Sequence, residues 1–143
     1  MVSVLVIIVS LPFVTLDVQN WPLAILVIFL TSMLFSIGGF INALFAESFD
    51  DVSIVPTFIL TPLSYLGGIF YSINLLPEFW RTVSLGNPIL YMVNALREAV
   101  LGSSDLASMN MTIQFALLMI VLFIIILFFL ALWLLNRGKG IRT

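Results

Sequence analysis

The sequence predicts an all-α membrane protein with four transmembrane helices and an external re-entrant or interfacial helical hairpin. Of its 143 residues, 62% are hydrophobic and 8% are charged, too few polar groups to cover the surface of a water-soluble globule. Long apolar runs alternate with short polar turns. One segment, 74–110, is too polar and too interrupted by proline and glycine to cross a bilayer, which predicts the hairpin.

The four spans are predicted at residues 2–16, 21–46, 52–73 and 111–135. A spanning helix needs about 20 apolar residues, and the first run falls short of that length. It has neither a basic leading region nor a small-residue cleavage site, so we interpret it as a span and not as a signal peptide. The whole chain, 1–143, then forms one transmembrane domain.

Lysine and arginine near the span ends predict the orientation. Three of them follow the last span in the tail 136–143, which places the C-terminus in the cytoplasm: Arg137, Lys139 and Arg142. The loop 47–51 then faces the cytoplasm, and segment 74–110 lies outside. Arg81 and Arg97 in that outer segment oppose this orientation, so it rests on three basic residues against two.

The second span carries a stripe of small residues on one helical face: Ser32, Ser36, Gly39, Ala43 and Ala46. Small residues let a second helix approach closely in lipid. Ordinary packing within the chain explains such a stripe, and a dimer interface or sliding face is the alternative. Asn42 lies beside the stripe, and we expect its side chain to bond to a neighbouring helix.

The third span carries a hydroxyl-rich stripe at helical spacing: Thr57, Thr61, Ser64, Gly68 and Ser72. Pro62 has no N–H to donate to the carbonyl of Phe58, so a kink is expected there unless nearby hydroxyls satisfy the freed groups. A structural kink is the simple interpretation. The sharper hypothesis is a helix that lines a substrate pathway, with Thr57, Thr61, Pro62, Ser64 and Gly68 as its candidate residues.

Two short helices are predicted in segment 74–110. The first begins after Pro77 and stops at Gly86, while the second has Asn87 as its cap and Pro88 in its first turn. The second ends at Gly102 and is roughly 20 Å long, against about 30 Å of hydrocarbon. Arg97 and Glu98 on this helix are therefore either functional or partnered, or an arginine simply reaches the interface.

The chain offers no complete site for catalysis. It has no cysteine and no histidine, which removes thiolate ligands and the commonest general base. Gly138-Lys139 lacks the rest of a phosphate-binding loop, because Trp133 stands where its first glycine belongs. Asp50-Asp51 lacks the further carboxylates of a metal site, and no base is available to activate a serine. An enzyme is not expected.

Several residues together resemble the signature of ABC type-2 transporter permeases of the bacterial inner membrane. The motif residues are Pro56, Pro62, the Gly67–Tyr71 run, Leu76-Pro77, Trp80, Asn87-Pro88, Tyr91 and Arg97. The stretch LFAESFDDVSIVPTFILTPLSYLGGIFYSINLLPEFW and the closing NRGKGIRT belong to the same resemblance. It covers the whole chain, but only the C-terminal part of such a permease. The family's first two spans and cytoplasmic coupling helix have no counterpart here, and 2–16 resembles a shortened third span.

The resemblance implies a role for each region. Family members dimerise and pair with separate ATPase subunits, so ATP and magnesium would bind the partner and this chain would bind no cofactor. Segment 77–101 would be the external hairpin that caps the exit, with these motif residues: Pro77, Trp80, Asn87, Pro88, Tyr91 and Arg97. The cytoplasmic loop would contact the ATPase through Glu47, Asp50 and Asp51.

The expected function is the membrane-spanning permease subunit of an ABC exporter that works by alternating access in the bacterial inner membrane. Family substrates include polysaccharides, lipid-linked glycans and hydrophobic drugs, and no residue here selects among them. A non-transporting assembly or scaffold protein, or an inactive permease fragment, is the alternative. The missing coupling helix leaves three possibilities: an incomplete record, a second polypeptide that supplies it, or an inactive product. A secondary transporter ranks third, because the predicted spans contain no buried acidic or histidine proton relay.

Overall fold

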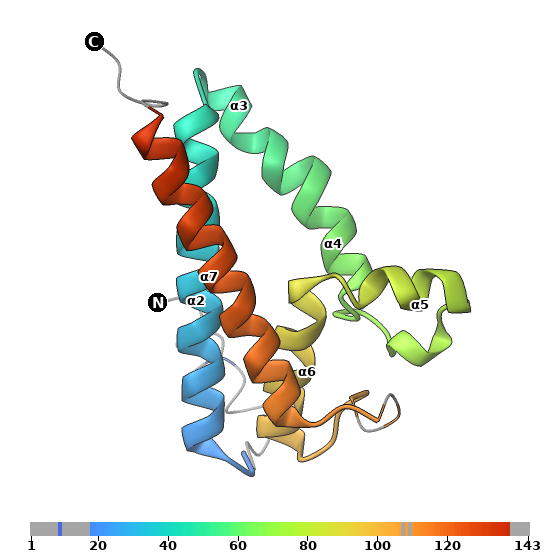
Figure 1. Cartoon of the computed structure of the whole chain (residues 1–143). Coiled ribbons are helices and arrows are strands. Elements are labelled where there is room, and N and C mark those ends of the chain that lie inside the picture. The colour runs from blue at the N-terminus through green and yellow to red at the C-terminus, as the bar shows by residue number, and fades with distance from the viewer. Residues whose placement is uncertain (1–8, 10–17, 107, 109, 138–143) are drawn as a thin grey trace.

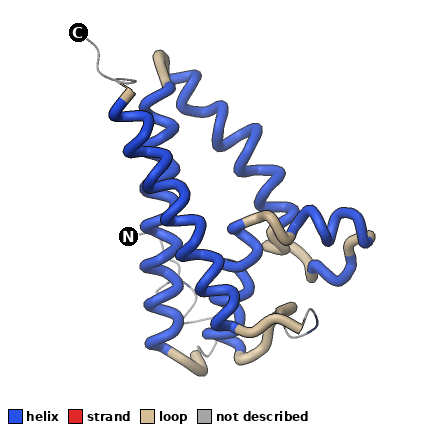
Figure 2. The backbone as a smooth tube through the Cα atoms, viewed as in Figure 1, coloured by secondary structure: helices blue, strands red, loops and turns tan. Residues whose placement is uncertain are grey.

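The computed structural model describes residues 9, 18–106, 108 and 110–137 (Figure 1). Helices joined by short loops make up this described part, and it contains no strand (Figure 2). The elements follow in this order: α2 (Trp21–Phe45), α3 (Phe49–Ile54), the π-helical turn η1 (Val55–Leu60), α4 (Thr61–Leu66), the 3₁₀ turn η2 (Ile73–Leu75), α5 (Glu78–Ser84), α6 (Pro88–Leu101) and α7 (Ile113–Asn136).

Two of the predicted spans are confirmed as long apolar helices. Within the described residues, α2 and α7 are the two helices long and apolar enough to cross a membrane. Side chains cap both starts: Asn20 accepts a hydrogen bond from the Leu23 N–H, and Thr112 accepts one from the Phe115 N–H. At the other end of α7, the Arg137 guanidinium lies over the Trp133 ring, 4.0 Å from its centroid.

The core is a three-helix bundle of α2, α6 and α7. In Figure 1, α2 and α7 run in the same direction and α6 runs opposite to both. Residues from all three helices form the main buried cluster, together with Ile73 and Leu106: Val27, Leu34, Leu90, Tyr91, Met92, Ala95, Ala116, Ile120 and Ile124. The shortest of the three helices, α6, contributes the most buried side chains, so it is a core element and does not lie on the surface.

The third predicted span differs from the structure in its bounds. Segments α3, η1 and α4 form one continuous helical rod over residues 49–66, which diverges from the bundle (Figure 1). The prediction of helix to residue 73 was wrong. The helix ends at Gly67, and Gly68 adopts a left-handed φ of 74°, a conformation that glycine accepts without steric cost.

Two predictions lie largely outside the described part of the chain. The span at residues 2–16 is described only at Val9, and the tail 136–143 only to Arg137.

Candidate functional site

Helix α6 lies along the first half of α2. At its C-terminal end, the carbonyl of Ala99 accepts a hydrogen bond from the Asn20 N–H at 2.9 Å, directly before α2. At its N-terminal end, Pro88 and Ile89 line a cavity together with Leu34, from the middle of α2. The helix therefore begins beside the middle of the bundle and ends at the level where α2 begins.

The predicted caps of the two short helices are found in the structure. The Asn87 side chain accepts a hydrogen bond from the Ile89 N–H, and Gly102 ends α6 with a left-handed φ of 68°. Helix α5 begins after Pro77 and ends just before Gly86.

Asn87 also joins α6 to α4. Its side-chain amide donates a hydrogen bond to the carbonyl of Leu63 at 2.6 Å. Close packing accompanies this bond, because a Cβ on Gly67 would lie 2.6 Å from Cγ2 of Ile89. On the side of α5, the Tyr91 hydroxyl donates to the carbonyl of Leu85 at 2.6 Å. The start of α6 is thus fixed to both preceding helices.

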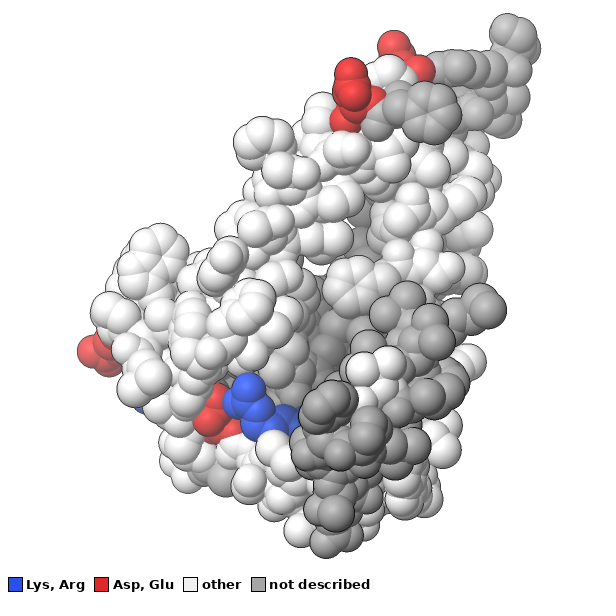
Figure 3. Space-filling model, turned by 180° about the vertical axis from the view of Figure 1, so that it is seen from behind, with Lys and Arg blue, Asp and Glu red and all other residues white. Residues whose placement is uncertain are grey.

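Arg97 has partners on two segments. Its Nη1 lies 3.2 Å from Oδ2 of Asp105 in an ion pair, and its Nη2 donates a hydrogen bond to the carbonyl of Gly68 at 3.2 Å. Both charged side chains are partly buried, with exposed fractions of 27% for Arg97 and 16% for Asp105. In the view of Figure 3, charged groups are sparse, and basic and acidic side chains meet in the lower part of the surface. Of the alternatives left open for Arg97, the structure shows a partnered side chain.

Asp105 is the centre of a wider polar cluster. Its Oδ1 accepts a hydrogen bond from the Ser72 hydroxyl at 2.8 Å, and its Oδ2 accepts one from the Ile73 N–H at 3.2 Å. Its own N–H donates to Oδ1 of Asn94, which is fully buried in α6. We call Asn94, Arg97, Asp105, Ser72 and Ile73 the Asp105 cluster. It joins α6, the 67–76 segment and the loop after α6.

Sequence reasoning did not identify Asp105. It lies in a short polar loop without a recognisable motif, and its partners precede it by 8 to 33 residues. The available signal was the negative charge of Asp105, which follows the positively charged Arg97 by 8 residues and lies beyond the helix stop at Gly102.

Helix α5 projects sideways from the bundle (Figure 1). Its apolar face is exposed and is formed by Phe79, Trp80 and Val83. Phe79 and Trp80 contact each other edge to face, with ring centroids 5.3 Å apart. The candidate hairpin residues therefore divide into two sets. Asn87, Pro88, Tyr91 and Arg97 belong to the packed helix α6, whereas Pro77 and Trp80 belong to the exposed part.

The π-helical turn η1 lies where the sequence predicts disturbed hydrogen bonding. Pro62 cannot donate to a backbone carbonyl, and the Thr61 N–H and hydroxyl both donate to the carbonyl of Pro56. The Ser64 hydroxyl donates to the carbonyl of Leu60 at 2.7 Å. The helical rod accommodates the proline through a wider turn and hydroxyl groups, as expected for π-bulges, which frequently occur at functional sites.

The candidate pathway residues do not gather in one cavity. Thr57, Thr61 and Pro62 are exposed, Ser64 is half-buried, and Gly68 is buried beneath Arg97. A nearby cavity of about 250 Å³ lies between α2, η1, α4, α6 and α7, and Val55, Pro56 and Leu60 are the η1 residues in its wall. Its lining is almost entirely apolar. Asn42 is the exception, and its amide donates to the carbonyl of Val52 at 2.9 Å, which confirms the predicted bond to a neighbouring helix.

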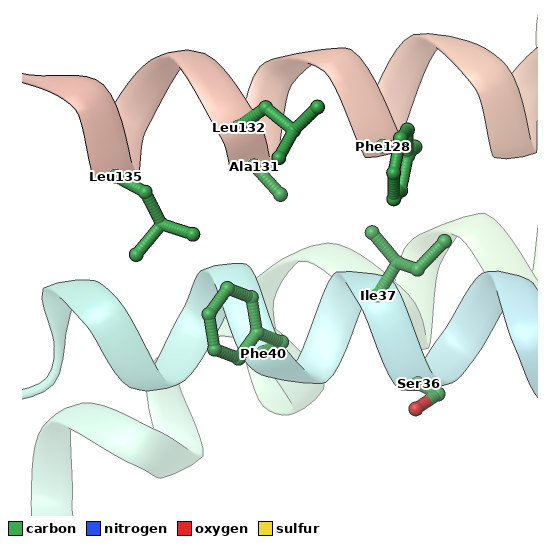
Figure 4. A pocket seen from close by; sticks show the side chains of 7 residues that line it. All are labelled: Ser36, Ile37, Phe40, Phe128, Ala131, Leu132 and Leu135. Carbon is green, nitrogen blue, oxygen red and sulfur yellow. The ribbon is translucent and has the colours of Figure 1, made fainter.

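The small-residue stripe of α2 lies outside the main buried cluster, and Gly39 lines the cavity beside η1. Four of its members are exposed and Ala46 is half-buried: Ser32, Ser36, Gly39, Ala43 and Ala46. A Cβ added to Gly39 would meet no atom within 4 Å. In Figure 4, Ile37 and Phe40 face α7 across a cavity of about 300 Å³, while Ser36 points away. Packing of the stripe within the described part of the chain is thus not observed.

The acidic loop is capped on itself. The Ser48 hydroxyl accepts from the Asp51 N–H, and Oδ2 of Asp51 accepts from the N–H groups of Ser48 and Glu47. The hydrogen bond with the Ser48 side chain, then those from the two backbone N–H groups, hold the pKa of Asp51 below its ordinary value. Glu47 and Asp50 are exposed. Among the described residues, no group of acidic side chains is arranged to hold a metal ion.

Comparison with known proteins identifies the family. The profile of the ABC-2 type transporter membrane domain matches residues 1–101. The chain belongs to the ABC-2 type transporter family. It is similar to the protein named inner membrane transport permease YadH from Escherichia coli strain K12, with 45% identity over 143 residues, covering 99% of this chain and 54% of the relative. The protein of that name from Shigella flexneri matches with the same identity and coverage.

The chain spans about half the length of these curated relatives. No solved structure matches it. The matched family region contains α2 through α6, so it includes the junction at Asn87 and the Arg97 side of the Asp105 cluster. The family match and the two long apolar helices together make this chain part of a multi-pass membrane protein of a transport family.

Proposed function

We propose that this chain acts as the membrane-spanning permease subunit of an ABC exporter in the bacterial inner membrane. A separate ATPase subunit binds ATP and magnesium and hydrolyses the nucleotide. The permease moves its substrate outward by alternating access, as a homodimer. The location follows the name of these relatives, inner membrane transport permease.

The observation that carries this proposal is the half-length helix α6 inside the bundle. It has 14 residues, which corresponds to roughly 20 Å, and lies between two helices of 24 or 25 residues. Such a helix enters the membrane from one side and stops within it. Together with α5 it forms a re-entrant hairpin. A hairpin of this kind is tolerated in lipid only where protein or water satisfies its backbone, and α6 is covered by α2 and α7.

The acidic loop and the end of α7 lie at the same end of the bundle, which supports a cytoplasmic position for both. The acidic loop before α3 and the end of α7 lie at one end of the bundle, and the beginning of α2 and the end of α6 lie at the other (Figure 1). Basic residues after α7 favour the cytoplasm for the first end. The exposed carboxylates Glu47 and Asp50 are then available to the ATPase, and the hairpin lies on the outer side.

The helical rod 49–66 is the proposed wall of the substrate pathway. It diverges from α2 and α7, and its widened turn η1 lies beside the apolar cavity. The hydroxyls of Thr61 and Ser64 donate hydrogen bonds to backbone carbonyls of the same rod. These internal bonds lower the polarity of the rod's surface and need no partner from another chain. A mainly apolar wall suits a substrate with an apolar part.

Copurification with an ATPase tests the class of function. The full permease, carrying an affinity tag, is purified from its native membrane and reconstituted into liposomes. We expect an ATPase subunit to copurify, with ATP hydrolysis lost when the permease is omitted. An intact permease that retains no ATPase, and whose deletion leaves export unchanged, would favour a scaffold or an inactive fragment.

Substitution tests the pathway wall. In the assembled transporter, Ser64→Leu and Thr61→Leu should reduce export severalfold, because each adds bulk along the proposed route. Ser64→Ala is the matched control for the loss of the hydroxyl alone, and Leu118→Ala alters an exposed position on α7. Unchanged export by both leucine variants would remove the pathway role from this rod.

A further inference from the structure

The segment 69–86, which contains η2 and α5, is held to the bundle mainly at its ends. Its large apolar side chains are mostly exposed, including Phe70, Leu75, Phe79 and Trp80. Helix α5 has its main packing contacts with α4 and not with the bundle. The segment therefore lacks the continuous buried face that normally fixes a helix in place.

At the C-terminal end, the segment leads directly into the packed helix α6. Tyr91 binds the carbonyl of Leu85, and the buried Ser84 hydroxyl donates to the carbonyl of Trp80 within α5. The Tyr91 bond joins the end of α5 to a helix that is itself in the core.

At the N-terminal end, the attachments are the Ile73 side chain, which is fully buried in the main cluster, and the carboxylate of Asp105. Both of its oxygens accept hydrogen bonds from residues 72 and 73, and Oδ2 also pairs with Arg97. Arg97 adds a second bond to the carbonyl of Gly68, whose left-handed φ marks a change of chain direction. Asp105 thus supplies the polar part of this attachment and joins the start of the segment to α6, while Ile73 supplies the apolar part.

The Arg97–Asp105 ion pair is accessible to water, and glycines lie at both ends of the segment. Arg97 and Asp105 keep 27% and 16% of their side-chain surface exposed, so water can replace their contacts without opening the bundle. Gly67 and Gly68 precede the segment, and Gly86 is its last residue. Glycine allows large changes in backbone angles at hinges.

We propose that Asp105 is a positioning residue which latches segment 69–86 against α6, and that release of this latch lets Ile73 leave the cluster and the segment swing about the glycines at 67–68 and 86. The inference rests on the proposed function only in naming the segment as the external gate of the permease. The latch itself is a property of the chain.

Distances between spin labels test the latch directly. The sequence contains no cysteine, so a pair of labels can be placed without background. Val83→Cys on α5 and Leu118→Cys on α7 are both exposed and report the position of the segment. Ile25→Cys on α2 with Leu118→Cys reports the fold of the bundle. Labelled full permease in lipid nanodiscs is diluted with unlabelled permease, so that distances within one chain dominate.

Four variants give the readout. Asp105→Ala and Arg97→Gln should raise the population of a second α5–α7 distance by about tenfold, which is the order expected for loss of a hydrogen bond to a charged group. Asp105→Asn, which keeps one acceptor oxygen, should give a smaller increase. Glu98→Gln is the matched control: it neutralises the next residue of α6, which forms no ion pair within the described residues.

Two results would overturn the proposal. An α5–α7 distance that stays unchanged in Asp105→Ala would show that the carboxylate does not hold the segment. Broadening of the α2–α7 distance together with the α5–α7 distance would show that the pair supports the fold as a whole. Because neither measurement involves transport, the proposed function can fail while the latch is upheld, and the reverse is equally visible.

Discussion

The side-chain amide of Asn87 donates a hydrogen bond to the backbone carbonyl of Leu63 at 2.6 Å, across 24 residues of sequence. The same side chain caps α6 by accepting from the Ile89 N–H. One residue therefore both starts the half-length helix and attaches it to the end of the helical rod.

Replacing Asn87 should destabilise the junction in two separable ways. Asn87→Ala removes the cap and the bond to Leu63, for an expected loss of about 1–3 kcal/mol. Asn87→Asp keeps the cap but replaces the donor with a second acceptor, so it should also lose stability. The carbonyl of Leu63 retains a bond from the Gly67 N–H, which limits the loss. Unfolding in detergent, followed by tryptophan fluorescence, measures these losses.

Asn136→Ala is the matched control for Asn87, because Asn136 is exposed at the end of α7. Equal stability of Asn87→Ala and this control would show that the junction contributes nothing.

Gly67 should tolerate no side chain while Ile89 faces it. A Cβ at this position would lie 2.6 Å from Cγ2 of Ile89 and 3.1 Å from the carbonyl oxygen of Leu63. Gly67→Ala should therefore cost about 1–3 kcal/mol through overpacking. Ile89→Ala removes that methyl group, so the double variant should lose less stability than the sum of the two single changes. Strict additivity in this cycle would argue against the close contact.

Much of the local structure could be predicted from short-range signals in the sequence. The caps at Asn87 and Gly102 defined α6, and proline and glycine placed α5 between Pro77 and Gly86. The long apolar runs predicted α2 and α7, and the bond from Asn42 to another helix was expected from a polar side chain on a membrane helix. Such features depend on neighbours within one helical turn or on hydrophobicity alone.

The remaining features depend on contacts that no local pattern encodes. Gly67 and Gly68 end the helical rod because Ile89 of α6 and Arg97 come close to them, and hydropathy continues past this point without a break. Asp105 became part of the site through bonds to residues 72 and 73, which are far from it in sequence. The small stripe of α2 could be found by its spacing, but the identity of the helix that faces it could not.

That stripe should matter for assembly and not for the fold of the described bundle. No atom lies within 4 Å of a Cβ placed on Gly39, so Gly39→Leu should not lower the thermal stability of the separated permease, and the higher helix propensity of leucine should raise it by up to about 1 kcal/mol. If the stripe packs against another helix in the assembled transporter, the same change should weaken that association. Size-exclusion chromatography of the complex measures it. Ile25→Phe adds comparable bulk elsewhere on α2, and equal weakening by this control would contradict a specific role for the stripe.

Asp51 should make the free energy of unfolding depend on pH in acidic solution. Hydrogen bonding to Ser48 and to backbone N–H groups lowers its pKa below the ordinary value of 3.8. The charged form is therefore favoured in the folded state, so its stabilising contribution is complete above that value and is lost as the pH falls through the lowered pKa. Asp51→Asn should be less stable than the parent at pH 7, and the difference should shrink below about pH 3.8.

Asp50→Asn serves as the comparison for Asp51, since it removes the exposed neighbouring charge. A stability difference between Asp51→Asn and the parent that stays constant across this pH range would rule out the proposed hydrogen bonding of the carboxylate.

The position of α6 has a consequence for the order in which the protein is built. This helix is too short to span the bilayer and carries Asn94, Arg97 and Glu98, so it gains little by entering lipid alone. Its cover comes from α2, which precedes it, and from α7, which is synthesised after it. During biosynthesis α6 can therefore reach its packed position only after α7 has been made. Helix α7 thus completes the niche that α6 fills.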